Sequence, residues 1–91
     1  MKQTISVLGA GAFGTAIANL IADNGFDVKL WCYEKEVQQS IQNKRENTLY
    51  FPNIKLNQNI IPTTELEYAI KNSKWIFQAI PVKFLRNILT Q

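Results

Sequence analysis

The chain contains no histidine and only one cysteine, Cys32, among its 91 residues. These counts exclude a disulfide framework and a zinc site built from cysteine and histidine, which needs about four such ligands. The sequence therefore predicts no metal site and a reducing compartment. Glycine and proline number only 4 and 3, whereas 46% of the residues are hydrophobic. This composition excludes disorder and collagen-like repeats, and it is typical of a packed globular chain.

The chain also lacks runs of like charge and long apolar runs. Ten Lys and Arg residues stand against seven Asp and Glu residues, and the basic ones are scattered from Lys2 to Arg86. Such a diffuse excess of +3 does not indicate a nucleic-acid partner. No apolar run reaches the roughly 18 residues of a membrane span, and the first residues are too soon interrupted by glycine for a signal peptide. A cytoplasmic location is the resulting expectation.

Strands and helices are predicted to alternate along most of the chain. The apolar patterns predict strands at 5–8, 28–33 and 75–80, and helices at 13–22, 34–42, 65–72 and 82–89. Gly25 is expected to end the first helix in a left-handed conformation, and Thr63 or Thr64 is expected to cap the third. The segment 43–64 is rich in Asn and broken by proline, so it is predicted to be irregular, with 59–61 as its one candidate strand.

Three glycines with the spacing Gly-x-Gly-x-x-Gly lie between the first predicted strand and the first predicted helix. Gly9 would allow the tight turn, Gly11 would let a pyrophosphate approach the backbone, and Gly14 would let helix and strand pack closely. Free N–H groups at the helix N-terminus would then face the phosphates. The predicted cofactor-binding loop is Gly9, Ala10, Gly11, Ala12, Phe13 and Gly14.

An acidic residue follows the second predicted strand, about 20 residues after the glycine motif, where a carboxylate is expected to bind the adenosine ribose. This residue is Glu34. A carboxylate there repels a 2′-phosphate and so favours NAD over NADP, although Lys35 would soften the effect. Tyr33 either lies against the adenine or ribose or is simply an exposed aromatic residue. Phe13 either covers the cofactor or is a plain core residue.

The first strand, helix and second strand span about 30 residues, which is the size of a βαβ unit. The predicted fold class is therefore α/β, a Rossmann-like parallel sheet with flanking helices. It is expected to be incomplete, because a doubly wound domain needs about six strands. Residues 1–91 are accordingly predicted to be the N-terminal part of a dinucleotide-binding domain in a larger enzyme.

No residue of the chain is predicted to be catalytic. Cys32 lies in an apolar strand, where a small buried thiol is expected rather than a nucleophile. The segment 44–47, with the sequence Lys-Arg-Glu-Asn, is expected to be either a solvated polar loop or a contact for an anionic substrate, and the solvated loop is favoured.

Longer strings of residues resemble the N-terminal domain of NAD(P)-dependent glycerol-3-phosphate dehydrogenase. The strings that carry the resemblance are residues 9–18, 28–31, 43–47 and 50–52, and 79–82 with Phe84. They follow one another along essentially the whole chain. The loop 43–52 and the strand with Trp31 narrow the resemblance to this family, since the glycine motif alone is shared by many dehydrogenases.

The resemblance implies an enzyme that reduces dihydroxyacetone phosphate to sn-glycerol 3-phosphate, a phospholipid precursor, with NAD or NADP. It implies that Tyr33 contacts the adenosine part and that Phe84 lies near the cofactor. It also implies a homodimer at full length, with the catalytic lysine and the helical substrate domain beyond this chain. The 91 residues alone are therefore expected to be inactive.

Two other functions are compatible with the glycine motif. One is a non-catalytic module that binds or senses a dinucleotide, because a fold does not fix a function. The other is a related dehydrogenase of a keto acid or sugar acid, against which the loop 43–52 argues.

Overall fold

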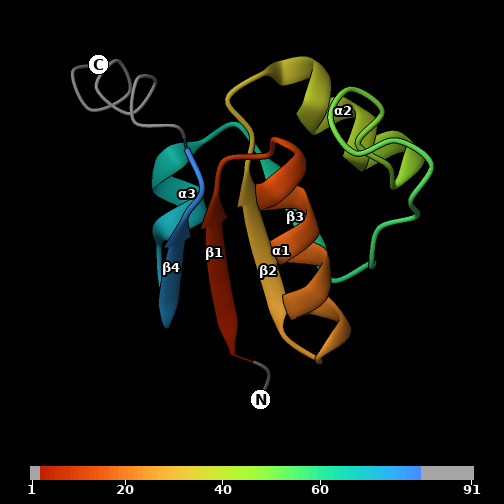
Figure 1. The fold of residues 1–91 in the computed structure, drawn as a ribbon. Helices are drawn as coiled ribbons and strands as arrows, with labels where there is room; N and C mark the ends of the chain where they lie inside the picture. The colour runs from red at the N-terminus through yellow and green to blue at the C-terminus, as the bar shows by residue number, and fades with distance from the viewer. Residues whose placement is uncertain (1–2, 81–91) are drawn as a thin grey trace.

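The computed structural model describes residues 3–80, which form one sheet of four parallel strands. The strands are β1 (Thr4–Leu8), β2 (Asp27–Trp31), β3 (Ile60–Thr63) and β4 (Trp75–Gln78), in the spatial order β3-β2-β1-β4 (Figure 1). β2 pairs with β1, and β3 pairs with β2 on the side away from β1. The chain then crosses back, and β4 pairs with the free side of β1. This order confirms the predicted Rossmann-like sheet and places its topological switch point between β1 and β4.

Helices cover both faces of the sheet (Figure 1). α1 (Ala12–Asp23) and α2 (Lys35–Lys44) contribute to one core cluster, which contains Val7, Val28 and Leu30 of the strands. α3 (Leu66–Ile70) packs on the opposite face, where its Ala69 belongs to a second cluster with Trp31. Because helices cover both faces, neighbouring residues of β2 that point to opposite faces are both buried, as Leu30 is in the first cluster and Trp31 in the second.

β2 contains two charged residues, Asp27 at its start and Lys29 at its centre, and α3 explains the presence of Lys29. Its Nζ atom donates hydrogen bonds to the backbone oxygens of Tyr68 and Lys71, at 3.1 and 3.0 Å. The same atom lies 4.5 Å from the centre of the Tyr68 ring. A cation at the C-terminal end of a helix is favoured by the helix dipole and by the carbonyl groups left free there. Lys29 thus holds the end of α3 against the sheet.

The ends of the helices agree with the sequence at one position and differ at another. Gly25 has φ of 94°, which confirms the predicted left-handed end of α1. The prediction that Thr63 or Thr64 caps α3 is wrong, because Glu65 is the N-cap and Thr63 belongs to β3. The Thr63 hydroxyl accepts a hydrogen bond from the Glu65 N–H at 3.0 Å, so it shapes the turn before the helix instead.

The candidate strand in the irregular segment is confirmed as β3, despite Pro62 within it. β3 is the outermost strand on its side of the described sheet, where a residue without an N–H group leaves no strand partner unsatisfied. The predicted helix 82–89 lies outside the described residues. None of the helices within residues 3–80 is both long enough and apolar enough to cross a membrane.

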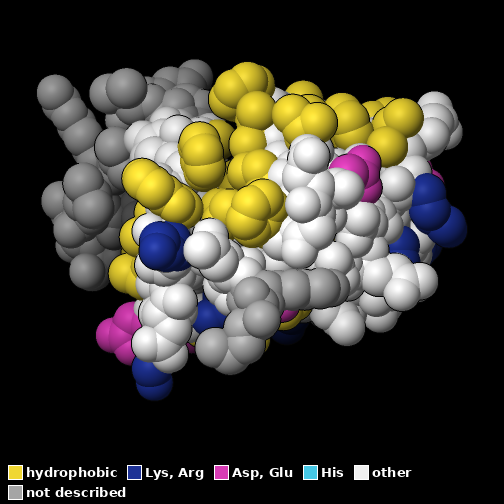
Figure 2. Space-filling view, turned by 90° about the horizontal axis from the view of Figure 1, so that it is seen from below, with side chains coloured by type: hydrophobic (Ala, Val, Ile, Leu, Met, Phe, Trp, Pro, Cys, Tyr) yellow, Lys and Arg dark blue, Asp and Glu magenta, His cyan; other side chains and the backbone are white. Residues whose placement is uncertain are grey.

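β4 differs from the buried strand that its apolar sequence suggests. Trp75, Ile76 and Phe77 are 61%, 51% and 49% exposed, because β4 is the outermost strand on the other side of the described sheet. Trp75 and Phe77 line a shallow hollow together with Leu20 and Phe26. Figure 2 shows hydrophobic side chains gathered in a patch on this side of the molecule.

The predicted burial of Cys32 is confirmed, but its predicted place inside the strand 28–33 is wrong, because β2 ends at Trp31 and Cys32 directly follows it. Burial raises the pKa of its thiol from 9.0 to about 12, against a smaller lowering by the backbone of Thr63. The folded state therefore keeps a proton that the unfolded state loses, and stability falls as the pH rises from about 9 toward 12.

We expect the free energy of unfolding, measured by urea titration, to fall more between about pH 8 and pH 10 in the wild type than in Cys32→Ala. Equal pH dependence in the two proteins would contradict this.

Candidate functional site

A cavity of about 600 Å³ lies where the C-terminal ends of β1, β2 and β4 meet. All predicted site residues within 3–80 line it, which are Gly9, Ala10, Gly11, Ala12, Phe13, Gly14, Tyr33 and Glu34. Phe84, the remaining predicted residue, lies outside the described residues. In open α/β sheets this edge, at the topological switch point, is where ligands bind.

The glycine turn has the geometry that the motif predicts. Gly9 has φ of 113°, which L-residues rarely adopt, and its N–H donates to the Trp31 oxygen at 3.1 Å. A Cβ atom on Gly14 would lie 1.8 Å from the Gly9 carbonyl oxygen, so the helix can start here only with glycine at that position. Gly11 has no atom within 4 Å of the place where a Cβ would stand, so its outer side is open.

The N-terminus of α1 opens into the cavity, and within residues 3–80 no side chain caps it. Gly11 is the N-cap and provides no capping hydrogen bond, and the first turn contains no acidic residue. The first backbone hydrogen bond of the helix is donated by Thr15 to the Gly11 oxygen at 3.0 Å. The N–H groups of the preceding turn therefore have no partner within the helix, and the helix dipole makes this end attractive to an anion.

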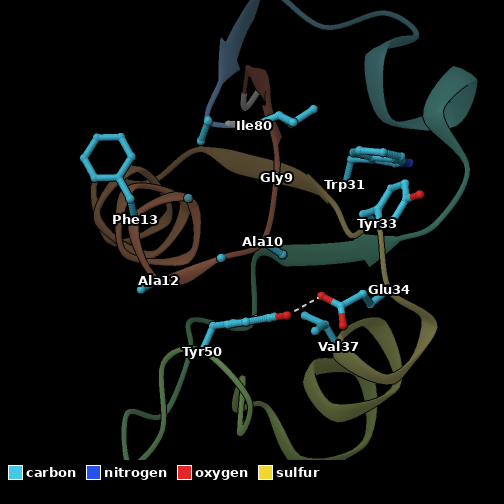
Figure 3. A pocket seen from close by; sticks show the side chains of 13 residues that line it. Gly9, Ala10, Ala12, Phe13, Trp31, Tyr33, Glu34, Val37, Tyr50 and Ile80 are labelled. Atoms are coloured by element: carbon cyan, nitrogen blue, oxygen red, sulfur yellow. Dashed lines mark hydrogen bonds between the residues drawn. The ribbon is translucent and has the colours of Figure 1, made fainter. Parts of the chain in front are cut away.

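The other end of the cavity is aromatic and carries one carboxylate. Tyr33 is 58% exposed, and its ring lies edge-on to Trp31 with the ring centres 5.9 Å apart. Glu34 is half-buried, and one of its carboxylate oxygens accepts a hydrogen bond from the Tyr50 hydroxyl at 2.5 Å. Figure 3 shows Glu34 and Tyr50 pointing toward one another across the cavity, with Phe13 beyond the glycine turn. This hydrogen bond to Glu34 is the main cause that raises the pKa of Tyr50.

Phe13 lines the cavity with a side chain that is 70% exposed. The alternative that it is a plain core residue is therefore wrong. Tyr33 likewise has both properties considered for it, because it is exposed and lines the cavity.

The expectation that the segment 44–47 is a solvated loop is wrong for its last residue, which is buried, whereas Lys44 is exposed and Arg45 and Glu46 are half-buried. Asn47 is fully buried, and its Nδ2 atom donates to the Ala10 oxygen at 2.8 Å and to the Thr15 hydroxyl at 2.9 Å. Its Oδ1 atom accepts from the Tyr50 N–H at 3.1 Å. Arg45 adopts a left-handed conformation and donates to the oxygens of Asn57 and Ile60. These polar side chains bind backbone groups inside the protein.

Sequence reasoning missed Trp31, Val37, Tyr50, Ala79 and Ile80, which also line the cavity. Ala79 and Ile80 follow β4, and a parallel sheet places the ends of β1 and β4 side by side once their pairing is known. Tyr50 carried no such signal, because it lies in a loop far from the glycine turn along the chain.

The parallel sheet order, the glycine turn and the carboxylate after β2 define the class of dinucleotide-binding α/β domains. Comparison with known proteins identifies the family. The family described as "NAD-dependent glycerol-3-phosphate dehydrogenase N-terminus" matches residues 4–91, and the chain belongs to it.

Relatives and solved structures agree with this assignment. The chain is 44% identical over 87 residues to a glycerol-3-phosphate dehydrogenase (NAD(P)+) of Bacillus licheniformis, covering 96% of this chain and 25% of that protein. It is 42% identical over 88 residues to the protein of the same name from Pseudomonas aeruginosa, covering 97% and 26%. Glycerol-3-phosphate dehydrogenase structures from Coxiella burnetii and Saccharomyces cerevisiae match with TM-scores of 0.89 and 0.88 at 29% and 28% identity. The matched regions cover 98% and 100% of this chain, and 27% and 30% of the Coxiella and Saccharomyces chains. The chain thus spans about a quarter of the length of its curated relatives.

We expect Gly14→Ala to lower the free energy of unfolding by about 3 kcal/mol or more, because the new Cβ would collide with backbone that cannot move without shifting β1 or α1. Gly11→Ala is the matched control, since it meets no atom within 4 Å and should cost less than about 1 kcal/mol. Urea titration followed by circular dichroism measures both. Similar losses in the two variants would contradict the close-contact argument.

Asn47→Ala is expected to cost about 2–4 kcal/mol, because it leaves the buried Ala10 oxygen, the Thr15 hydroxyl and the Tyr50 N–H without their partner. Asn43→Ala, on an exposed position of α2, should change the free energy of unfolding by no more than about 0.5 kcal/mol. The same titration tests this pair, and a loss at position 47 no larger than at position 43 would show that the three hydrogen bonds stabilise nothing.

Proposed function

We propose that the chain is the N-terminal, cofactor-binding part of a glycerol-3-phosphate dehydrogenase. The proposed reaction is the reduction of dihydroxyacetone phosphate to sn-glycerol 3-phosphate by hydride transfer from NADH or NADPH, and its reverse. The observation that carries the proposal is the family match over residues 4–91, on a chain whose glycine turn opens into the cavity.

In this proposal the pyrophosphate of the cofactor lies against the open side of Gly11, close to the free N–H groups that begin α1. The adenosine lies toward Tyr33 and Glu34, with the carboxylate accepting hydrogen bonds from the ribose hydroxyls. Phe13 covers the cofactor from the far side of the glycine turn, and Phe84 is proposed to approach it from the segment after β4. The cofactor supplies the hydride, and these residues bind and orient it.

No residue of this chain is given a catalytic role, and the family's substrate-binding domain is proposed to lie outside these residues. Among residues 3–80 no cluster of three or more Asp, Glu, Cys or His side chains could hold a metal ion. A homodimer of the full-length enzyme, a cytoplasmic location and the absence of a nucleic-acid partner stay predictions. The scattered basic residues support the last of these.

Calorimetric titration of NADH and of NADPH at equal salt tests the proposed site, on the longest chain of this protein that can be produced. We expect tighter binding of NADH, because Glu34 repels the 2′-phosphate of NADPH. Gly11→Ala should lower the affinity for both nucleotides by about tenfold, because its Cβ would stand where the pyrophosphate approaches. The same substitution should cost little stability, since the Cβ meets no atom within 4 Å. Tighter NADPH binding would overturn the NAD preference, and binding of neither nucleotide would overturn the site.

Residues 1–91 alone are expected to reduce no dihydroxyacetone phosphate, because they span about a quarter of the length of the curated relatives and the family's catalytic lysine is proposed to lie outside them. A spectrophotometric assay of NADH oxidation with this substrate measures it. Turnover well above the uncatalysed rate would show that a catalytic group has been overlooked in these residues.

A further inference from the structure

We infer that Tyr50 is a specificity-determining residue, which acts by holding the Glu34 carboxylate at the ribose end of the cavity so that it discriminates against a 2′-phosphate. This inference rests on the proposed function. It assigns a role to a loop residue that is 43% exposed and comes from neither the glycine motif nor a strand end.

Glu34 is not held by its own helix. It is the N-cap of α2, yet its side chain makes no capping hydrogen bond with the N–H groups there. Among residues 3–80, the hydrogen bond that orients the carboxylate comes from the Tyr50 hydroxyl, at 2.5 Å. Because Tyr50 bonds one carboxylate oxygen, the other remains available to accept from a ribose hydroxyl. Without Tyr50 the carboxylate is free to rotate toward solvent, where its charge is screened.

Tyr50 is itself fixed relative to the glycine turn. Its N–H donates to the Asn47 side chain, and the Phe51 N–H donates to the Asn47 backbone oxygen at 2.9 Å. Asn47 in turn donates to the Ala10 oxygen inside the glycine turn, and Phe51 packs on the main core cluster. The turn 47–51 therefore sets the position of Glu34 from the same anchor that shapes the phosphate end of the cavity.

The arrangement makes the effect of Tyr50 on the two cofactors unequal. NADH would gain from a carboxylate held at its ribose, because a preoriented acceptor loses less conformational freedom on binding. NADPH would be repelled by the same held charge. Removing the Tyr50 hydroxyl should therefore weaken NADH binding and leave NADPH binding unchanged or slightly tighter. A residue that only stabilised the loop would weaken both nucleotides alike.

Titration of NADH and NADPH into the wild type, Tyr50→Phe, Glu34→Ala and the double variant tests this, on the longest chain that can be produced. We expect Tyr50→Phe to raise the dissociation constant of NADH about fivefold and to change that of NADPH by less than about twofold. In the Glu34→Ala background the same substitution should leave the ratio of the two dissociation constants unchanged, because Tyr50 acts through the carboxylate. Tyr68→Phe, an exposed tyrosine on α3 outside the cavity, is the matched control and should change neither.

If Tyr50→Phe changes the dissociation constants of NADH and NADPH equally, so that their ratio stays the same, the inference is overturned and the proposed function remains in place. A change of ratio that persists in the Glu34→Ala background would also overturn it, since Tyr50 would then act on the cofactor directly. If the wild type binds neither nucleotide, the proposed function fails, and this inference fails with it.

Discussion

The first turn of α1 lies so close to the end of β1 that no side chain fits between them. A Cβ on Gly14 would stand 1.8 Å from the Gly9 oxygen, and one on Gly9 would meet the backbone of Ala79 at 3.0 Å. This contact brings the helix N-terminus to the carboxyl edge of the sheet, beside the end of β4. The open side of Gly11, the free N–H groups of α1 and the cavity between β1 and β4 all depend on it.

A second constraint comes from a segment that has no regular structure. Asn47 is buried, and it uses its amide to bind the glycine turn, α1 and the N–H of Tyr50 together. Removing this side chain is costly, because the Ala10 oxygen and the Thr15 hydroxyl would lose hydrogen bonds that are buried away from water. The glycine turn and Glu34 belong to different βα connections, and the turn 47–51 links them.

The parts that could be predicted from the sequence depend on neighbours along the chain. The glycine turn, the carboxylate after β2 and the left-handed Gly25 follow from local spacing and from what a backbone without Cβ can adopt. The role of the segment 44–47 could not be predicted, because its polar residues are typical of a solvated loop. Their partners, the glycine turn and the segment 57–60, are distant along the chain. The start of α3 was misplaced for a similar reason, since the pairing of β3 with β2 draws Thr63 into the strand.

The sequence by itself determined the α/β class, the position of the glycine turn and the family, because three glycines at fixed spacing and long ordered strings of residues are local properties of the chain. Only the tertiary structure decided which residues complete the cavity. Ala79 and Ile80 reach it through the parallel pairing of β4 with β1, and Tyr50 reaches Glu34 through the anchoring of Asn47. These contacts join residues far apart in sequence, so neither hydrophobic periodicity nor motif spacing predicts them.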